Sequence, residues 1–514
     1  MNKKRSKHDE KGNQDEKSVS GLLAVLMVMS VFLAACGDKG AEDQGSQTYN
    51  PKSRLEFTWL NVLHTASPPT ETIKSKIEEY TNSKITFNWV PDASKEERIT
   101  TALASGELAD MVTLTMLTNS SVRSSLKSGL FWDVGKYLDD YGNLKKIPPE
   151  VREAASIEGV LYGVPFQKNL ARAGLVIRQD WLDRLGLKVP TTLDELYEVA
   201  RAFTEDDPDG NGKNDTTGFV DRSDLRYSSF KTLSSYFGTP NGWKVDETGK
   251  FTPEFDTPQY METLKYSHKL YENGYLSKDF AVTAKTDQQQ QFAQGKAGIY
   301  TGMIDIANLR TLSQGLQKGL KLVPVNKISN GDGKYHVWSE GSGVGGLLAF
   351  PKSEVKTEAE LKRLLQFVDD LIDKDVYMYM TGGIEGTHYK LDKDGAFKIM
   401  NTDLWQADVQ PFSSSRPSEV TYNLKDANPE KELANQLVRE NSKFAVLDPT
   451  VPLDSVTANE QGTELEKIIT DASFKFIMGE TDEAGFKAAV ENWKKSGGAR
   501  ITAEYEEAYK NTKK

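Results

Sequence analysis

Three short apolar segments decide the fold: Leu55-Glu-Phe-Thr-Trp59, Ile85-Thr-Phe-Asn-Trp-Val90 and Asp110-Met-Val-Thr-Leu114. In the first segment apolar side chains alternate with polar ones, which is typical of a strand. Residues 71–80 and 95–108 lie between the segments and carry helical patterns. Strand, helix, strand, helix, strand predicts a parallel, doubly wound α/β sheet.

Ligands of such sheets bind beyond the carboxyl ends of the strands. Residues 61–69 and 115–120 follow these ends, and we expect part of a binding site there. Two later helices are predicted by capping boxes, Thr192-Leu-Asp-Glu195 and Thr357-Glu-Ala-Glu360. Each box precedes an apolar stripe, so both helices should face a core.

The N-terminus differs in kind from the rest of the chain. A net positive stretch, 1–17, precedes an uncharged apolar run that ends in Leu33-Ala34-Ala35-Cys36. This ending resembles the lipobox of bacterial lipoproteins, in which the cysteine takes a lipid. An ordinary signal peptide, or a short anchor helix, with an incidental cysteine is the alternative. Cys36 is the single cysteine of the chain, so we predict a lipoprotein signal peptide over 1–35 and lipidation of Cys36.

Composition narrows the class of protein further. Residues 36–53 are polar and rich in small side chains, which predicts a flexible tether. The net charge of −11 argues against a nucleic-acid partner. No later segment approaches the roughly 20 apolar residues that cross a bilayer. We therefore expect a protein anchored by lipid to the extracellular face of the cell membrane.

A loop after the helix capped by Thr192 has the oxygen spacing of a calcium site. Alternate positions of Asp207-Pro-Asp-Gly-Asn-Gly-Lys-Asn-Asp215 supply oxygen, as in an EF-hand. The predicted ligands are Asp207, Asp209, Asn211, the Lys213 carbonyl and Asp215. Gly218 stands where an EF-hand places its bidentate glutamate, and a solvated turn without metal is the alternative. We favour structural calcium, because carboxylates this close repel one another without a cation.

No catalytic motif is recognisable in the chain. His64, His268, His336 and His388 show no metalloprotease spacing, and there is no G-x-S-x-G and no P-loop. Carboxylates are numerous, so their number does not exclude a pair of catalytic carboxylates like that of a glycosidase.

Five further segments carry a family resemblance: Ser105-Gly-Glu-Leu-Ala-Asp110, Gly159-Val-Leu-Tyr-Gly-Val-Pro-Phe166, 178–192, Phe292-Ala-Gln-Gly-Lys-Ala-Gly298 and Gly383-Ile-Glu-Gly-Thr-His-Tyr389. In this order they resemble the extracellular solute-binding proteins of ABC-type carbohydrate importers, in their large lipoprotein form. The resemblance implies a two-lobed periplasmic-binding-protein-like fold of type II. Each lobe would be a mostly parallel sheet flanked by helices, and hinge crossovers would join the lobes.

The resemblance also implies the division of the chain. The first lobe would comprise residues 54–167 and 343–405, and the second lobe residues 168–342 and 406–514. A carbohydrate would bind between the lobes and pass to the ABC permease, and the binding protein would be a monomer. Calcium-containing alginate-binding proteins of this family are similar at the loop, with a ligand from the tenth position, which is Thr216 here.

Aromatic rings stack on the faces of sugars, and polar side chains bind the hydroxyls. At the implied cleft the candidate contacts are Trp59, His64, Phe166, Lys168, Arg172, Tyr300, Trp338 and Glu340. Core packing or a surface position is the alternative for each of them.

The leading hypothesis is a binding protein that captures an oligosaccharide and delivers it to an importer. The alternatives are a cell-surface polysaccharide-processing enzyme and a sensor or adhesion lipoprotein that does not transport. The missing catalytic motif argues against the enzyme, whereas the sequence does not separate importer from sensor.

Overall fold

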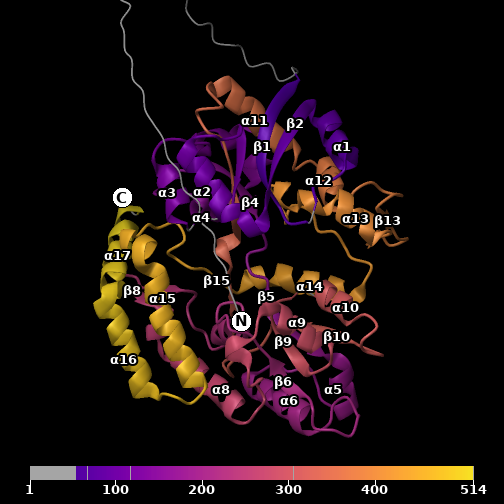
Figure 1. The fold of residues 1–514 in the computed structure, drawn as a ribbon, viewed down its shortest axis with the longest axis vertical. Coiled ribbons are helices and arrows are strands. Elements are labelled where there is room, and N and C mark those ends of the chain that lie inside the picture. Colours follow the sequence, from indigo (N-terminus) through magenta and orange to yellow (C-terminus); the bar gives the residue numbers. More distant parts are fainter. Residues whose placement is uncertain (1–53, 66, 116, 118, 305, 513–514) are drawn as a thin grey trace, which may run out of the picture. The chain divides into compact units, whose positions relative to one another are not determined.

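The computed structural model describes residues 54–65, 67–115, 117, 119–304 and 306–512. The predicted signal peptide, Cys36 and the tether lie outside these residues. The first predicted elements are β1 (Leu55–Leu63), α1 (Glu71–Thr81), β2 (Ser83–Pro91), α2 (Lys95–Ser105) and β3 (Met111–Leu114) (Figure 1). β1 pairs in parallel with β2 and with β3, so the doubly wound start is confirmed.

Two more strands complete the first sheet, whose order is β2-β1-β3-β12-β4. β4 (Gly163–Gln167) and β12 (Val344–Ala349) lie at one side of it, and β12 runs antiparallel to both of its neighbours. The helices that share the core of this sheet are α3 (Ser120–Lys127), α4 (Pro149–Ala155), α11 (Glu358–Asp370), α12 (Lys374–Thr381) and α13 (Thr402–Asp408). A hairpin of β13 (Tyr389–Leu391) and β14 (Phe397–Ile399) lies between α12 and α13 in the chain.

The first core lies between this sheet and its helices. Phe57 and Trp59 both meet Phe367 of α11 edge-on, at centroid distances of 4.8 and 6.1 Å. Burying each such ring stabilises the fold by about 1.5–3 kcal/mol. Val409 and Phe412 belong to the same core, although they lie beyond residue 405.

The second sheet has the order β10-β5-β9-β6. Its strands are β5 (Ala173–Arg178), β6 (Thr217–Val220), β9 (Ala297–Met303) and β10 (Leu322–Val325). β10, β9 and β6 run in one direction and β5 runs against them. In the first sheet β12 alone runs against the other strands. Each sheet is therefore mostly parallel in strand direction, as predicted, with one antiparallel strand. β5 follows β4 after only residues 168–172, where the chain passes from the first sheet to the second.

A separate set of elements surrounds the second sheet and its own core. They are α5 (Gln179–Leu185), α6 (Leu193–Glu205), α7 (Ser229–Tyr236), α8 (Pro258–Glu272), α9 (Lys285–Ala293), α10 (Ile306–Ser313), α14 (Pro429–Glu440), α15 (Val456–Ile477), α16 (Glu483–Trp493) and α17 (Ala499–Thr512). Short strand pairs add β7 (Trp243–Val245) with β8 (Phe251–Pro253) and β11 (Val337–Trp338) with β15 (Ala445–Val446). Among the residues described, no helix is long and apolar enough to span a membrane.

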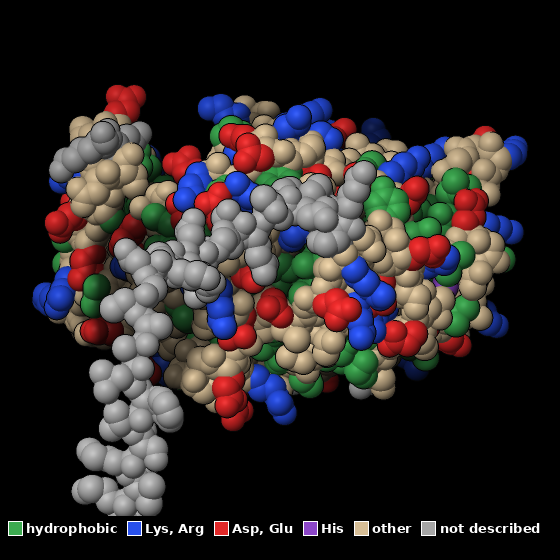
Figure 2. Space-filling view, turned by 90° about the horizontal axis from the view of Figure 1, so that it is seen from above, with side chains coloured by type: hydrophobic (Ala, Val, Ile, Leu, Met, Phe, Trp, Pro, Cys, Tyr) green, Lys and Arg blue, Asp and Glu red, His purple; other side chains and the backbone are tan. Residues whose placement is uncertain are grey.

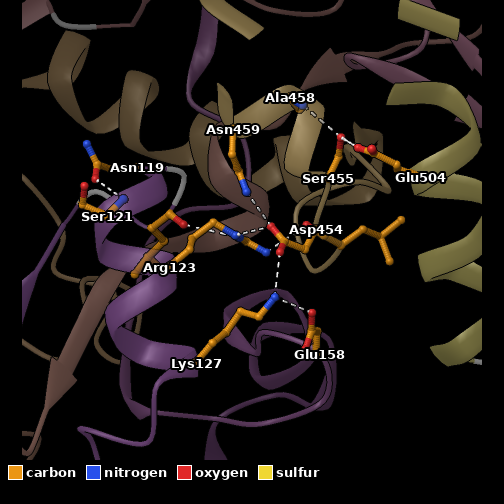
Figure 3. Close-up of polar contacts among 12 residues, drawn as sticks. Asn119, Ser121, Arg123, Lys127, Glu158, Asp454, Ser455, Ala458, Asn459 and Glu504 are labelled. Atoms are coloured by element: carbon orange, nitrogen blue, oxygen red, sulfur yellow. Dashed lines mark hydrogen bonds and ion pairs between the residues drawn. The ribbon is translucent and has the colours of Figure 1, made fainter. Parts of the chain in front are cut away.

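A polar joint connects elements of the two cores. Arg123 and Lys127 of α3 bind the carboxylate of Asp454, which lies two residues before α15 (Figure 3). The Arg123 Nε–Asp454 Oδ1 distance is 3.1 Å and the Lys127 Nζ–Asp454 Oδ2 distance is 2.9 Å. Arg123 also donates to the Leu453 carbonyl at 2.9 Å. Because Arg123 is only 7% exposed, this joint is screened from water far better than a surface pair.

Candidate functional site

Polar side chains gather where strands of both sheets end. His64 follows β1 and Asp92 follows β2 at the carboxyl edge of the first sheet. In the second sheet, Arg222 comes two residues after β6, and Arg172 directly precedes the antiparallel β5. Arg172 therefore shares an edge with the carboxyl ends of β6 and β9. Such edges are where open α/β sheets bind ligands.

His64 lies half-exposed in a charged setting. Its Nδ1 is 3.3 Å from Asp92 Oδ1. Burial lowers the pKa of His64, Asp92 opposes that effect, and Lys95 and Lys168 add to it, so the pKa lies below its usual value. The ring is therefore mainly neutral at neutral pH and can both donate and accept a hydrogen bond.

The residues between β4 and β5 carry two ion pairs. Lys168 Nζ lies 3.2 Å from Glu419 Oε1, and Arg172 binds Glu340. Tyr227 donates its hydroxyl to Glu340 Oε1 at 2.9 Å. Burial would raise the pKa of Glu340, but Arg172 and Tyr227 outweigh it and hold the pKa below its usual value. The site therefore presents ionised, hydrogen-bonded groups of both signs.

The other candidate contacts are buried. Trp59 and Phe166 belong to the first core, Tyr300 and Trp338 to cores of the second sheet. The Trp59 indole donates to Thr113 Oγ1 at 3.0 Å. With 5% or less of each residue exposed, these four rings offer no open face for stacking in this structure.

Sequence reasoning missed four residues at this site: Arg222, Arg226, Tyr227 and Glu419. The first three lie in the loop from β6 to α7. A strand prediction for residues 217–220 would have pointed to that loop, because it leaves a carboxyl edge. Glu419 carries no local signal, since its partner Lys168 is 251 residues away in the chain.

The predicted calcium loop is a compact turn. The Asn211 side-chain amide donates to Asp209 Oδ2 at 2.8 Å and to Asp215 Oδ1 at 3.1 Å. The Asp207 carboxylate accepts from the backbone N–H groups of Asn211 and Gly212. These carboxylates thus accept hydrogen bonds from the loop's own N–H groups, and no cluster of three acidic, histidine or cysteine side chains is formed among the residues that the structure describes.

Thr216 points away from this loop. Its hydroxyl donates to the Phe203 carbonyl of α6 at 2.8 Å, and the residue is 8% exposed. The hydroxyl thus fastens the loop to the helix.

A separate cavity of about 210 Å³ lies where α12, α13 and β14 approach α14. Its lining includes Trp405, Arg416 and Lys431. Charges elsewhere are mixed: Figure 2 shows basic and acidic side chains interspersed over one face of the molecule. The described residues that are visible there form no broad basic surface of the kind that binds nucleic acid.

Comparison with known proteins decides the family. Residues 66–371 match the model of the bacterial extracellular solute-binding proteins. The chain belongs to this family. It is 45% identical to the polygalacturonan/rhamnogalacturonan-binding protein YtcQ of Bacillus subtilis (strain 168), over 96% of this chain and 99% of that protein. It is 34% identical to lipoprotein LipO of the same organism, over 95% and 98%.

Solved structures show the same two-lobed fold. An HMO-binding solute-binding protein associated with an ABC transporter of Bifidobacterium longum infantis aligns with a TM-score of 0.68 and 19% identity, over 89% of this chain and 99% of that chain. Alginate-binding protein AlgQ2, solved without calcium ion, aligns with a TM-score of 0.62 and 19% identity, over 89% and 98%. The predicted two-lobed α/β fold is thereby confirmed, and the family is one of extracellular binding proteins.

Proposed function

We propose that this chain captures an oligosaccharide between its two lobes and delivers it to an ABC importer. The observation that carries the proposal is the 45% identity to YtcQ over nearly the whole of both chains. Because YtcQ is named for binding polygalacturonan and rhamnogalacturonan, fragments of such polysaccharides are the first ligands to test. Polar groups at the ends of β1, β5 and β6 would bind the sugar hydroxyls.

We place the ligand contacts at the exposed members of the predicted set: His64, Lys168, Arg172 and Glu340. These side chains are between about a third and two fifths exposed. Trp59, Phe166, Tyr300 and Trp338 would instead support the site from the cores. The lobes would be those expected from the sequence, with the first lobe extended to Phe412, since Val409 and Phe412 pack in its core.

We propose binding without catalysis. The family is one of binding proteins, and the chain contains no recognisable catalytic motif. A sensor that binds without transport differs from an importer in its partners rather than in its fold. Loss of sugar uptake on deleting the gene, with regulation unchanged, would favour the importer.

We also propose a lipid anchor at Cys36 and a structural calcium ion in loop 207–215. The anchor is supported by the Leu-Ala-Ala-Cys sequence after an apolar run and by the likeness to a protein named a lipoprotein. A Cys36→Ser variant that stays in the membrane fraction would contradict it. Two observations support calcium. The oxygen-bearing residues have the spacing of a calcium loop, and the carboxylates of Asp209 and Asp215 both accept a hydrogen bond from the side-chain amide of Asn211, so they lie close together.

A thermal-shift experiment tests the function. The protein, extracted from its host membrane in mild detergent, is heated with oligogalacturonides, rhamnogalacturonan fragments and neutral oligosaccharides. A ligand at 100 times its Kd should stabilise the folded protein by about 2.7 kcal/mol. Stabilisation by none of the sugars would refute carbohydrate capture, and chromatographic evidence of turnover would show an enzyme.

A further inference from the structure

The loop from β6 to α7 brings charged and aromatic groups to the binding edge of the second sheet. It begins with Asp221 and Arg222, directly after β6, and contains Arg226 and Tyr227. The carboxyl ends of β6 and β9 and the start of β5 meet at this edge. The loop therefore reaches the edge where Arg172 and Glu340 pair.

Tyr227 is the centre of this group. Its hydroxyl is held by Glu340, and its ring lies 5.8 Å from the ring of Trp338. The guanidinium groups of Arg222 and Arg226 each lie 5.7 Å from the centroid of the Tyr227 ring. Two positive charges are thus held beside one ring.

Among the described residues, these two arginines have one carboxylate within ion-pair distance between them, that of Asp224. The Arg222 side chain is only 8% exposed, yet its nearest acidic partner, Asp224, is 3.4 Å away, and its Nε has no hydrogen-bond acceptor among the described residues. Asp221 is occupied by the backbone N–H and hydroxyl of Ser229. Arg226 is exposed and forms no ion pair within the part of the chain that the structure describes.

Arg222 differs from the neighbouring cationic side chains in its hydrogen-bond partners. Lys168 and Arg172 are each bound to a glutamate, whereas Arg222 is buried and its Nε has no acceptor among the described residues. A buried guanidinium N–H group without an acceptor loses hydration that nothing replaces. An incoming carboxylate would restore that interaction, and the planar guanidinium fork matches its two oxygens.

We propose that Arg222 and Arg226, together with the Tyr227 ring, form a subsite that binds the carboxylate of a uronate residue in the oligosaccharide. This subsite rests on the proposed function and names the class of sugar that the site selects. The carboxylate would pair with the guanidinium groups, and the sugar ring would lie near Tyr227. Selection would come from charge, because a neutral sugar brings no carboxylate to the unpartnered Nε of Arg222.

The test compares two probes of equal length: an oligogalacturonate and its fully methyl-esterified, uncharged form. Affinity is measured by calorimetry on the protein in mild detergent. We expect the wild type to prefer the acid by about 10-fold or more, as loss of a charged hydrogen bond predicts. Arg226→Gln and Arg222→Lys should each lower affinity for the acid by about 10-fold and leave affinity for the ester nearly unchanged. Arg500→Gln, on the exposed face of α17, is the matched control.

The outcomes separate this subsite from the function itself. Equal wild-type affinity for acid and ester, or equal losses for both probes in Arg226→Gln, would overturn the subsite while the protein still binds carbohydrate. Unchanged acid affinity in both arginine variants would overturn it too. Binding of neutral oligosaccharides alone would have the same consequence. Failure to bind any carbohydrate would instead refute the proposed function. Circular dichroism checks that Arg222→Lys is folded, and Arg226→Gln tests the subsite at an exposed position.

Discussion

At the scale of single residues, Asp221 shows how burial changes a carboxylate. The side chain accepts hydrogen bonds from Ser229, and burial raises its pKa from 3.8 to about 6. Because the folded pKa exceeds the unfolded one, protonation stabilises the folded state fully below pH 3.8, and this contribution is lost as the pH rises through about 6. Asp221→Asn stays neutral, so we expect its stability relative to wild type to increase by up to about 3 kcal/mol between pH 4 and pH 7. Urea unfolding of both proteins measures this, and a difference independent of pH would contradict it.

At the scale of one element, loop 207–215 links α6 to β6. If calcium binds the carboxylates of this loop, a chelator that removes the ion leaves the carboxylates to repel one another. The chelator should therefore lower the melting temperature of the protein, and added calcium should restore it. Asp209→Ala should abolish this response. Asp246→Ala is the control, because Asp246 closes an exposed turn of similar kind by accepting from Thr248 and Lys250. A wild-type protein without bound metal in elemental analysis and without a chelator effect would leave the loop a simple turn.

At the scale of the whole molecule, the Arg123–Asp454 joint connects the two cores. Asp454→Ala leaves the nearly buried Arg123 guanidinium without its carboxylate partner, which costs about 1–3 kcal/mol. We expect the lobes to open more readily, with a larger radius of gyration in X-ray scattering and weaker ligand binding. Glu158→Ala, which removes an exposed partner of Lys127, is the control. Burial raises the pKa of Asp454, but Lys127, Asn459 and Arg123 outweigh it and hold the pKa below its usual value of 3.8. The ion pairs of Asp454 with Arg123 and Lys127 should therefore be lost by protonation only below about pH 3.8. Unchanged scattering in Asp454→Ala would contradict this role.

Local patterns predicted most elements, because neighbouring residues decide caps and periodicity. Thr357 forms the complete capping box with Glu360. At Thr192 only half of the box is present, since the Glu195 carboxylate binds Thr191 instead. The direction of β5 could not be predicted, because it is defined against β9 and β10, which come more than a hundred residues later in the chain.

By itself the sequence determined the order of strands and helices, the two-lobed family and the segments that reach the sheet edges. The periodicity of apolar residues and the capping residues act over a few neighbouring positions, so they can be recognised in the sequence alone. Only the tertiary structure decided which side chains face the site. It placed Trp59 and Trp338 in cores, and it paired Lys168 with Glu419 and Tyr227 with Glu340 across 251 and 113 residues. Such contacts arise from the packing of distant segments, and no local pattern encodes them.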